Sequence, residues 1–320
     1  MSSTPRISSR PRARRQRGAA LLTAMIIVTL VATLAAAMVW QQWRAVQVES
    51  AERARAQAAW ILSGALDFAR LILREDQKSG KVTALTEPWA TPLAESRLST
   101  FLAIDKANAE DGPEAFLSGT IVDAQARFNV NNLVDSTTMP PKPSVPQLEI
   151  FRRLCEYVGV DAGTADRIAT GLLSARTASN GAAPLAPETV AQLRWLGIDA
   201  TAIQALQPYV VLLQGSTAVN PNTASKEVLA AVLNIDPASA ERLVQMRQRT
   251  PFKNAAALKE AAGLTKDPVQ MAFFSSYFEV TGRLRLVDRV LVERSLVRRN
   301  GPQVDVLRRE RIASLEQVGS

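Results

Sequence analysis

Three aspartates with nearly equal spacing are the most regular candidates for chemistry in this 320-residue sequence. Asp161, Asp199 and Asp236 each follow a glycine or asparagine and one apolar residue, in the tripeptides GVD, GID and NID. A carboxylate placed there accepts hydrogen bonds from the free backbone N–H groups that begin a helix. Gly and Asn readily take the left-handed conformation that ends the preceding helix. The pattern predicts that these aspartates cap helices in repeated helix-hairpin-helix units, as in sterile-alpha-motif-like domains.

Residues for catalysis or metal binding are scarce in the composition. The chain has no histidine and a single cysteine, Cys155, so the commonest general base, imidazole ligands and an intramolecular disulfide are all excluded. Cys155 lies between helical neighbours such as Leu154 and Tyr157, as expected of a core residue. The nucleotide-binding pattern GxxxxGK and the nucleophile-elbow pattern GxSxG are also missing. We therefore expect a protein that is not an enzyme and that needs neither a metal nor a cofactor.

An apolar N-terminal segment must hold the rest of the chain in place. Residues 19–40 carry no charge, and as a helix they are about 33 Å long, enough to cross a hydrocarbon layer of ~30 Å. Six arginines precede Gly18 and supply most of the formal net charge of +8, while Trp40 and Trp43 follow the segment. Arginine favours the cytoplasmic side of a membrane and tryptophan the interface. We expect a single-pass protein with a cytoplasmic N-terminus and an exported C-terminal part.

The membrane helix is expected to continue into residues 41–78. No proline occurs between Ala19 and Glu87, and apolar residues recur at helical spacing from residue 54 to residue 72. Three alternatives apply to the apolar segment: a secretory signal cleaved near residues 35–37, a twin-arginine signal, and a plain signal anchor. A continuous helix disfavours the first, because a secretory signal is normally followed by a break.

Farther along the chain the patterns change twice. Residues 77–100 contain Gly80 and two prolines and are predicted to form a loop, and residues 116–122 and 127–133 are predicted strands. Helical patterns follow, and from residue 276 apolar residues alternate up to a hairpin at Asn300-Gly301. We expect an α+β fold in which the long N-terminal helix packs on an antiparallel sheet that carries an inserted helical domain. The expected regions are a basic N-terminal segment (1–18), the membrane helix (19–40), its continuation (41–78), the first part of the α/β domain (79–135), the inserted helical domain (136–270) and the C-terminal strands (271–320).

The N-terminal motif resembles the class III leader of type IV pilins and type II secretion pseudopilins. The resemblance lies in Arg-Gln-Arg-Gly18 followed by an apolar run that begins Ala-Ala-Leu-Leu. It implies that a prepilin peptidase cuts between Gly18 and Ala19 and methylates the new N-terminus at Ala19. Thr23 would then be the fifth mature residue, where most pseudopilins carry glutamate. The minor pseudopilin K family of type II secretion is known for lacking this acid.

Two internal segments are similar to the same family. One is Asp-x-x-x-Arg-Phe-Asn-x-Asn-Asn-Leu at residues 123–133, whose asparagines we expect to cap a tight hairpin. The other is the Asn-Thr-Ala-Ser segment within residues 220–229, where Thr223 is the expected helix cap. Several members of the family bind calcium through an acidic loop in the helical domain. Residues 174–187 of this chain contain no acidic side chain, so we expect no calcium site there.

The resemblance implies a pseudopilin fold and a non-enzymatic subunit at the tip of the type II secretion pseudopilus, which assists assembly for the export of folded proteins across the outer membrane. The implied partners are minor pseudopilins I and J, the other pseudopilins, the inner-membrane assembly platform and, for processing, the prepilin peptidase. The implied location is the inner membrane, with the C-terminal domain in the periplasm.

Two alternatives are a minor pilin of a type IV pilus and a signal-anchored periplasmic helix-hairpin-helix protein that binds DNA. Helix-hairpin-helix units often bind DNA phosphates through backbone N–H groups in the hairpin. In this chain the hairpin aspartates would repel phosphate, so nucleic acid is not an expected partner.

Overall fold

The computed structural model describes residues 17–80, 82–98, 115–177, 185–286 and 289–312. The chain divides into two compact units, Met1–Ala59 and Trp60–Ser320, each considered by itself below. Helix α1 (Arg17–Lys78) is continuous, as the absence of proline predicts. In the second unit its buried residues Leu62, Leu66, Ala69 and Leu73 are three or four positions apart, so they share one face of the helix.

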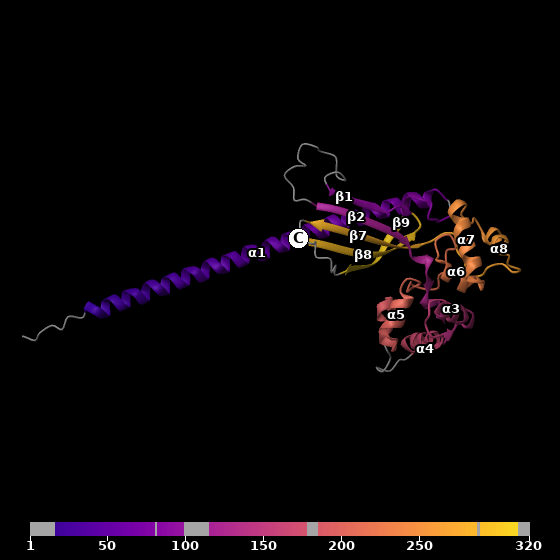
Figure 1. Ribbon diagram of the computed structural model, residues 1–320, viewed down its shortest axis with the longest axis horizontal. Coiled ribbons are helices and arrows are strands. Elements are labelled where there is room, and N and C mark those ends of the chain that lie inside the picture. The colour runs from indigo at the N-terminus through magenta and orange to yellow at the C-terminus, as the bar shows by residue number, and fades with distance from the viewer. Residues whose placement is uncertain (1–16, 81, 99–114, 178–184, 287–288, 313–320) are drawn as a thin grey trace, which may run out of the picture. The chain divides into compact units, whose positions relative to one another are not determined.

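An antiparallel sheet of five strands packs against this face of α1 (Figure 1). Trp89 and Phe278 meet edge to face in the layer between helix and sheet, with ring centroids 5.2 Å apart. The mixed fold with a long helix on an antiparallel sheet is confirmed. The strand order is β1 (Leu93–Arg97), β2 (Ala115–Asp123), β7 (Tyr277–Leu286), β8 (Arg289–Asn300) and β9 (Gln303–Ile312).

Two local predictions about strands are wrong. Strand β1 lies inside the segment that was predicted as loop, where it pairs with β2 through an irregular register. The predicted second strand at residues 127–133 is mostly the 3-10 helix η3 (Val130–Leu133), and only β3 (Phe128–Asn129) is extended. The reason is tertiary: β2 pairs with β7 on one edge and with β1 on the other, so no hairpin forms with the residues that follow β2.

The residues between β2 and β7 are mainly helical and have their own core. Phe128 and Phe151 stack at 5.2 Å between ring centroids, beside Leu154 and the fully buried Cys155. Burial raises the pKa of the Cys155 thiol to about 12, consistent with the predicted core role. The helices are α3 (Val145–Tyr157), α4 (Gly163–Thr177), η4 (Val190–Leu196), α5 (Ala200–Leu206), α6 (Lys226–Leu233), α7 (Pro237–Arg249) and α8 (Ala255–Ala262).

Short elements connect the helical region to the sheet. Strand β3 pairs in parallel with β6 (Val210–Val211), and β4 (Val134–Asp135) pairs with β5 (Lys142–Pro143). The 3-10 helix η2 (Ala124–Ala126) follows β2 directly, and η1 (Pro88–Ala90) precedes β1. The polypeptide therefore leaves the sheet at the end of β2 and returns to it at β7, so the two crossing points lie close together.

Candidate functional site

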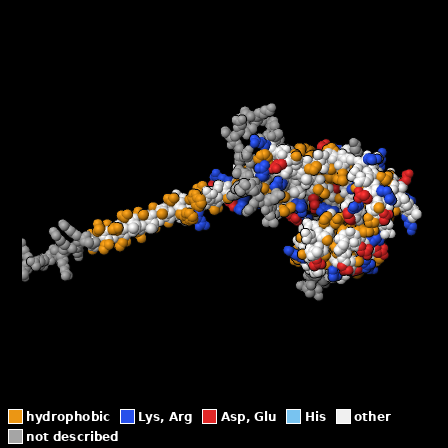
Figure 2. Space-filling view, in the orientation of Figure 1, with side chains coloured by type: hydrophobic (Ala, Val, Ile, Leu, Met, Phe, Trp, Pro, Cys, Tyr) orange, Lys and Arg blue, Asp and Glu red, His pale blue; other side chains and the backbone are white. Residues whose placement is uncertain are grey.

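The first candidate surface is the apolar N-terminal part of α1. Among the described residues, one helix is long and apolar enough to cross a membrane, and its apolar window is completely unburied. Figure 2 shows hydrophobic side chains along the visible face of this stretch. Trp40 and Trp43 stack with ring centroids 5.5 Å apart. A helix with apolar side chains on every face suits a lipid environment.

Thr23 lies within this apolar stretch and makes only local hydrogen bonds. Its hydroxyl donates at 3.0 Å to the carbonyl oxygens of Ala19 and Ala20 on the preceding turn. Gly18 and Ala19 both belong to α1, which begins at Arg17. Residues 1–16 of the expected leader lie outside the described residues. At Thr23 the helix thus carries a neutral hydroxyl whose hydrogen bonds stay within the helix.

The helix-hairpin-helix turns have the backbone geometry that the sequence predicts. Gly159, Gly197 and Asn234 have φ values of 73°, 76° and 52°, in the left-handed region. Asp199 caps α5, because its carboxylate accepts from the backbone N–H of Ala202 at 2.9 Å. In α7 the Asp236 carboxylate accepts in the same way from the backbone N–H of Ser239, also at 2.9 Å.

Asp161 departs from this pattern. Helix α4 begins two residues later, at Gly163, and the backbone carbonyl of Asp161 accepts from the N–H of Thr164 at 2.9 Å. No hydrogen bond to the Asp161 carboxylate is found within the described part of the chain. The first unit of the repeat therefore has the predicted hairpin but a different helix start.

A buried polar cluster around Asp123 joins the helical region to the sheet. The Asp123 carboxylate, 1% exposed, accepts from the hydroxyls of Ser275 at 2.6 Å and Thr223 at 2.7 Å. It also accepts from the side-chain amide of Asn220 at 3.0 Å and the backbone N–H of Gln125 at 2.8 Å. The four donors come from three segments that are far apart in sequence, so this single side chain ties them together.

Burial raises the pKa of the Asp123 carboxyl, while the hydrogen bonds from Ser275, Thr223, Gln125 and Asn220 oppose that shift. No cation is among these donors. A buried carboxylate without a counter-charge costs free energy unless its oxygens are fully hydrogen-bonded. The cluster is thus stable only when all the donor segments are in place.

Gln125 and Asn220 extend the cluster along the backbone. The Gln125 side chain accepts from the N–H of Ser276 at 2.6 Å and donates to the carbonyl of Ala218 at 3.0 Å. The Asn220 side chain also donates at 3.0 Å to the carbonyl of Thr83, which follows α1. The joint therefore reaches from the end of α1 through η2 to the start of β7.

The three asparagines of the Phe-Asn-x-Asn-Asn segment hold a neighbouring loop and do not cap a hairpin. Asn132 binds Thr217 twice, accepting from its N–H at 3.0 Å and donating to its carbonyl at 2.8 Å. Asn129 accepts from the N–H of Leu213 at 3.0 Å, and Asn131 donates to the carbonyl of Leu213 at 2.8 Å. Their role is structural, as predicted, but their partner is the segment after β6.

The prediction that Thr223 caps the following helix is wrong. Its hydroxyl binds Asp123, and the cap of α6 is Ser225, whose hydroxyl accepts from the N–H of Val228 at 3.4 Å. In the same segment Asn222 accepts from the N–H of Phe252 at 2.8 Å and donates to its carbonyl at 3.0 Å. The Asn-Pro-Asn-Thr-Ala-Ser segment is thus a connector between the sheet and the helical region.

Sequence reasoning missed Asp123, Asn220 and Ser275 as a group. Both segments that resemble the pseudopilin family contain members of the cluster, since one begins at Asp123 and the other at Asn220. The presence of both residues in family-like segments was the sequence signal for the cluster. Ser275 lies in neither segment, so no sequence signal marked it.

The cluster does not have the composition of a catalytic or metal centre. Within the described ranges, no group of three or more Cys, Asp or Glu side chains is placed to hold a metal ion. Residues 178–184, the centre of the stretch in which no calcium site was expected, lie outside the described residues. Asp123 is fully enclosed by protein donors, so its arrangement positions chain segments and leaves no room for a substrate.

Comparison with known proteins agrees with this fold. Residues 126–215 and 219–276 match two family models described as type II secretion system (T2SS), protein K. The chain is 30% identical over 306 residues to type II secretion system protein K of Pseudomonas aeruginosa, covering 86% of each chain. It is 29% identical to the protein of the same description from Klebsiella pneumoniae, covering 92% of this chain and 96% of that one.

A solved structure has the same fold. The crystal structure of the GspK-GspI-GspJ complex from the enterotoxigenic Escherichia coli type 2 secretion system contains a chain that matches with a TM-score of 0.61 and 21% identity. The match covers 82% of this chain and 99% of that one. With the identity to the Pseudomonas protein, these matches show that the chain belongs to the type II secretion system protein K family, the minor pseudopilins K.

Proposed function

We propose that this chain caps the tip of the type II secretion pseudopilus and assists its assembly, without enzymatic activity. The observation that carries the proposal is Thr23, an uncharged residue in the unburied, uncharged N-terminal stretch of α1. In pseudopilins the glutamate at this position neutralises the N-terminal ammonium of a neighbouring subunit within the lipid. Thr23 has no charge, so it suits the one place in a filament where no earlier subunit needs neutralising. An unpaired carboxylate at that depth would cost several kcal/mol.

The N-terminal residues support a proposal for processing and location. A prepilin peptidase would cut between Gly18 and Ala19 and methylate Ala19, which removes residues 1–18. Residues 19–40 would then span the inner membrane, with the N-terminus on the cytoplasmic side and the remainder in the periplasm. The leader arginines and the Trp40–Trp43 pair support this orientation.

Minor pseudopilins I and J are the proposed immediate partners. The support is the Escherichia coli structure, in which the chain of the same fold is in a complex with GspI and GspJ. Other pseudopilins and the inner-membrane assembly platform would contact the chain during assembly. The helical region, fixed to the sheet by the Asp123 cluster, supplies bulk that would prevent addition of a further subunit above it.

The N-terminal mass of the chain, purified from membranes of cells that contain a prepilin peptidase, tests the processing route. We expect a chain that begins at Ala19 and carries one methyl group. A start near Met38, or an intact leader, would contradict the pseudopilin route. For the tip position, immunogold labelling of overproduced pseudopili should mark one end of each filament, and labelling along the shaft would contradict a capping role.

The arrangement of the hairpins argues against DNA binding. The carboxylates of Asp199 and Asp236 each accept from one backbone N–H in the first turn of α5 and α7, and their negative charge would repel a phosphate at these helix starts. We expect no binding of duplex DNA by the detergent-solubilised full chain even at low salt, where phosphate contacts are strongest.

A further inference from the structure

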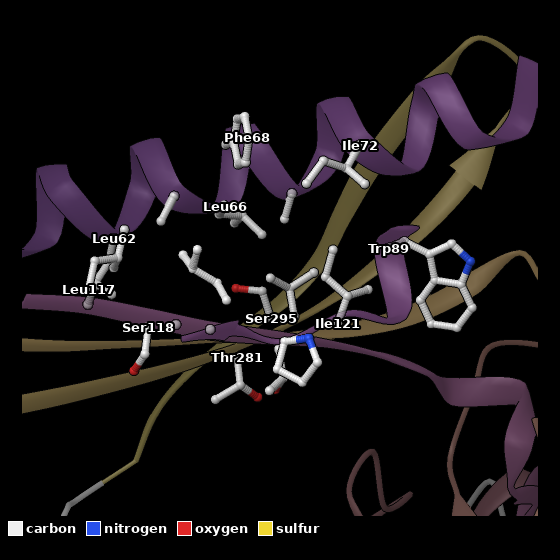
Figure 3. A pocket seen from close by; sticks show the side chains of 18 of the residues that line it. Leu62, Leu66, Phe68, Ile72, Trp89, Leu117, Ser118, Ile121, Thr281 and Ser295 are labelled. Atoms are coloured by element: carbon white, nitrogen blue, oxygen red, sulfur yellow. The ribbon is translucent and has the colours of Figure 1, made fainter. Parts of the chain in front are cut away.

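A cavity of about 260 Å³ lies between α1 and the sheet in the second unit. Figure 3 shows Leu62, Leu66 and Ile72 of α1 above it and Leu117 and Ile121 of β2 below. Trp89 and the neighbouring prolines Pro88 and Pro92 also line it. For comparison, a dry apolar cavity of about 150 Å³ holds a benzene molecule. The space is large enough for a long side chain from another molecule.

The sheet forms the cavity because side chains are missing from its floor. Gly119 of β2 and Gly282 of β7 lie directly opposite each other in the ladder, and both line the cavity. A Cβ atom at Gly119 would lie 3.0 Å from the carbonyl oxygen of Thr281, and one at Gly282 would lie 3.1 Å from the Leu62 side chain. Because neither glycine has a side chain, the two strands and α1 pack closely at this point, and the space beside the glycines stays open.

Among the described residues that line the cavity, Glu293 of β8 is the only one with a charged side chain. It makes no hydrogen bond or ion pair with any residue that the structure describes, although Arg311 lies opposite it in the β8–β9 ladder. A half-buried carboxylate beside apolar walls gains from a cation and rejects an anion. Apolar walls and a single carboxylate together match a lysine or arginine, whose methylene stem is apolar and whose tip is positive.

The exposed side of α1 shows where such a side chain would come from. Phe68 lines the cavity and is 46% exposed. It lies four and eight residues after Gly64 and Trp60, so these three residues share one face of the helix. Trp60 is 79% exposed, and nothing lies within 4 Å of a Cβ atom built at Gly64. A second helix laid along this face would pass beside the opening at Phe68.

We infer that the cavity receives a lysine or arginine side chain from an α-helix of a neighbouring minor pseudopilin, whose methylenes contact Leu66 and Ile121 and whose cationic tip pairs with Glu293. The inference rests on the proposed function, which supplies such a neighbour. The pairing sets which subunit fits and in which register, because a helix without a basic residue at this height leaves Glu293 unpaired.

Co-purification with co-expressed minor pseudopilins I and J tests the inference on the full chain in mild detergent. Ala65→Leu narrows the cavity from its α1 wall, and Glu293→Gln removes the charge. We expect each to reduce recovery of one partner about tenfold, equivalent to about 1.4 kcal/mol. The matched controls Ala200→Leu, at an exposed site of α5, and Glu156→Gln, at an exposed site of α3, should leave recovery unchanged. The Ala65→Leu chain should melt at or above the wild-type temperature, which separates cavity filling from misfolding.

Photocrosslinking from p-benzoylphenylalanine at position 68 gives a second, independent result. We expect a crosslinked helical peptide of minor pseudopilin I or J that has a lysine or arginine within one turn. Unchanged recovery with both cavity variants, or a crosslink to this chain itself or to an exported protein, overturns the inference and leaves the tip assignment intact. If the wild-type chain recovers neither I nor J, the proposed function fails instead.

Discussion

The Asp123 carboxylate and the Ser275 hydroxyl lie 2.6 Å apart, although the residues are 152 positions apart in the chain. Asp123 ends β2 and Ser275 precedes β7, so this contact closes the base of the helical region where it joins the sheet. Thr223 and Asn220 complete the closure from within the helical region. The orientation of the helical region therefore depends on one buried carboxylate.

Asp123→Asn should destabilise the second unit by about 1–3 kcal/mol, the cost of a buried polar group without a partner. An asparagine has one acceptor oxygen. Its amide nitrogen would therefore face either the N–H of Gln125 or the three side-chain donors, from Asn220, Thr223 and Ser275, at the other oxygen position. Denaturant unfolding of the full chain in detergent measures the change. Asp135→Asn is the matched control. Like Asp123, Asp135 accepts from the backbone N–H two residues later, that of Thr137, but this hydrogen bond is exposed. An equal loss in both variants would show that the cluster has no special role.

The stability difference between wild type and Asp123→Asn should depend on pH. Burial raises the pKa of Asp123 in the folded state, so the folded chain binds this proton more tightly than the unfolded chain does. This contribution to stability is present below the ordinary aspartate pKa and is lost as the pH rises through the folded-state value. The advantage of wild type over the variant should therefore be larger near pH 4.5 than near pH 7.5. Denaturant midpoints at both pH values measure it, and an advantage that grows with pH would contradict the shift.

Asn222→Asp should weaken the joint between the 220–229 segment and the segment before α8. Asn222 donates to the Phe252 carbonyl and accepts from the Phe252 N–H, and a carboxylate retains only the second bond. We expect a loss of about 1–3 kcal/mol, because the side chain is 1% exposed. Denaturant unfolding of the full chain in detergent measures the loss. Asn300→Asp, in the exposed β8–β9 turn, is a suitable control.

The two classes of hairpin aspartate should respond differently to replacement. Asp199→Ala removes a side-chain cap and should cost about 1 kcal/mol, the typical value for such a cap. Asp161→Ala should cost less, because its helix start uses the backbone carbonyl, which alanine retains. Thermal unfolding of the two variants compares them. A larger effect at Asp161 would indicate a role outside the helix start.

Substitutions at position 23 test whether the Thr23 hydroxyl acts only within its own helix or contacts another subunit. Thr23→Val should leave secretion of a type II substrate within about twofold of wild type, because the lost hydroxyl binds only its own helix. Thr23→Glu places an unpaired carboxylate in lipid and should reduce the amount of chain in assembled pseudopili. Substrate in the culture supernatant and chain content of sheared pseudopili are the readouts. Loss of secretion in Thr23→Val would show that the hydroxyl contacts another subunit.

Local patterns in the sequence predicted the elements whose cause is local. The absence of proline predicted α1, and Gly or Asn before an apolar residue and Asp predicted the left-handed hairpins at Gly159, Gly197 and Asn234. Alternation with Asn300-Gly301 predicted the final hairpin, where Gly301 has a φ of 57°. Each of these features is set by residues within one or two turns of each other.

Features that depend on distant residues were not predictable in this way. Thr223 has the sequence context of a helix cap, but its hydroxyl donates to the buried carboxylate of Asp123 at 2.7 Å. Residues 127–133 alternate like a strand, but β2 is already paired with β7 and the asparagines bind the segment at Leu213. Helix propensity and alternation contain no information about a partner almost a hundred positions away.

The position of β7 in the chain controls the order in which residues 60–320 can fold. Strand β2 pairs along its length with β7, which follows the whole helical region in the chain and is therefore synthesised after it. Before that moment β1 and β2 form at most a two-stranded ribbon, which is marginal in water, and pairing between such distant segments is slow. The helical region therefore matures first and the sheet closes last. A chain interrupted before Tyr277 would keep an open strand edge, exposed to aggregation and proteases, so closure of the sheet depends on synthesis of the final strands.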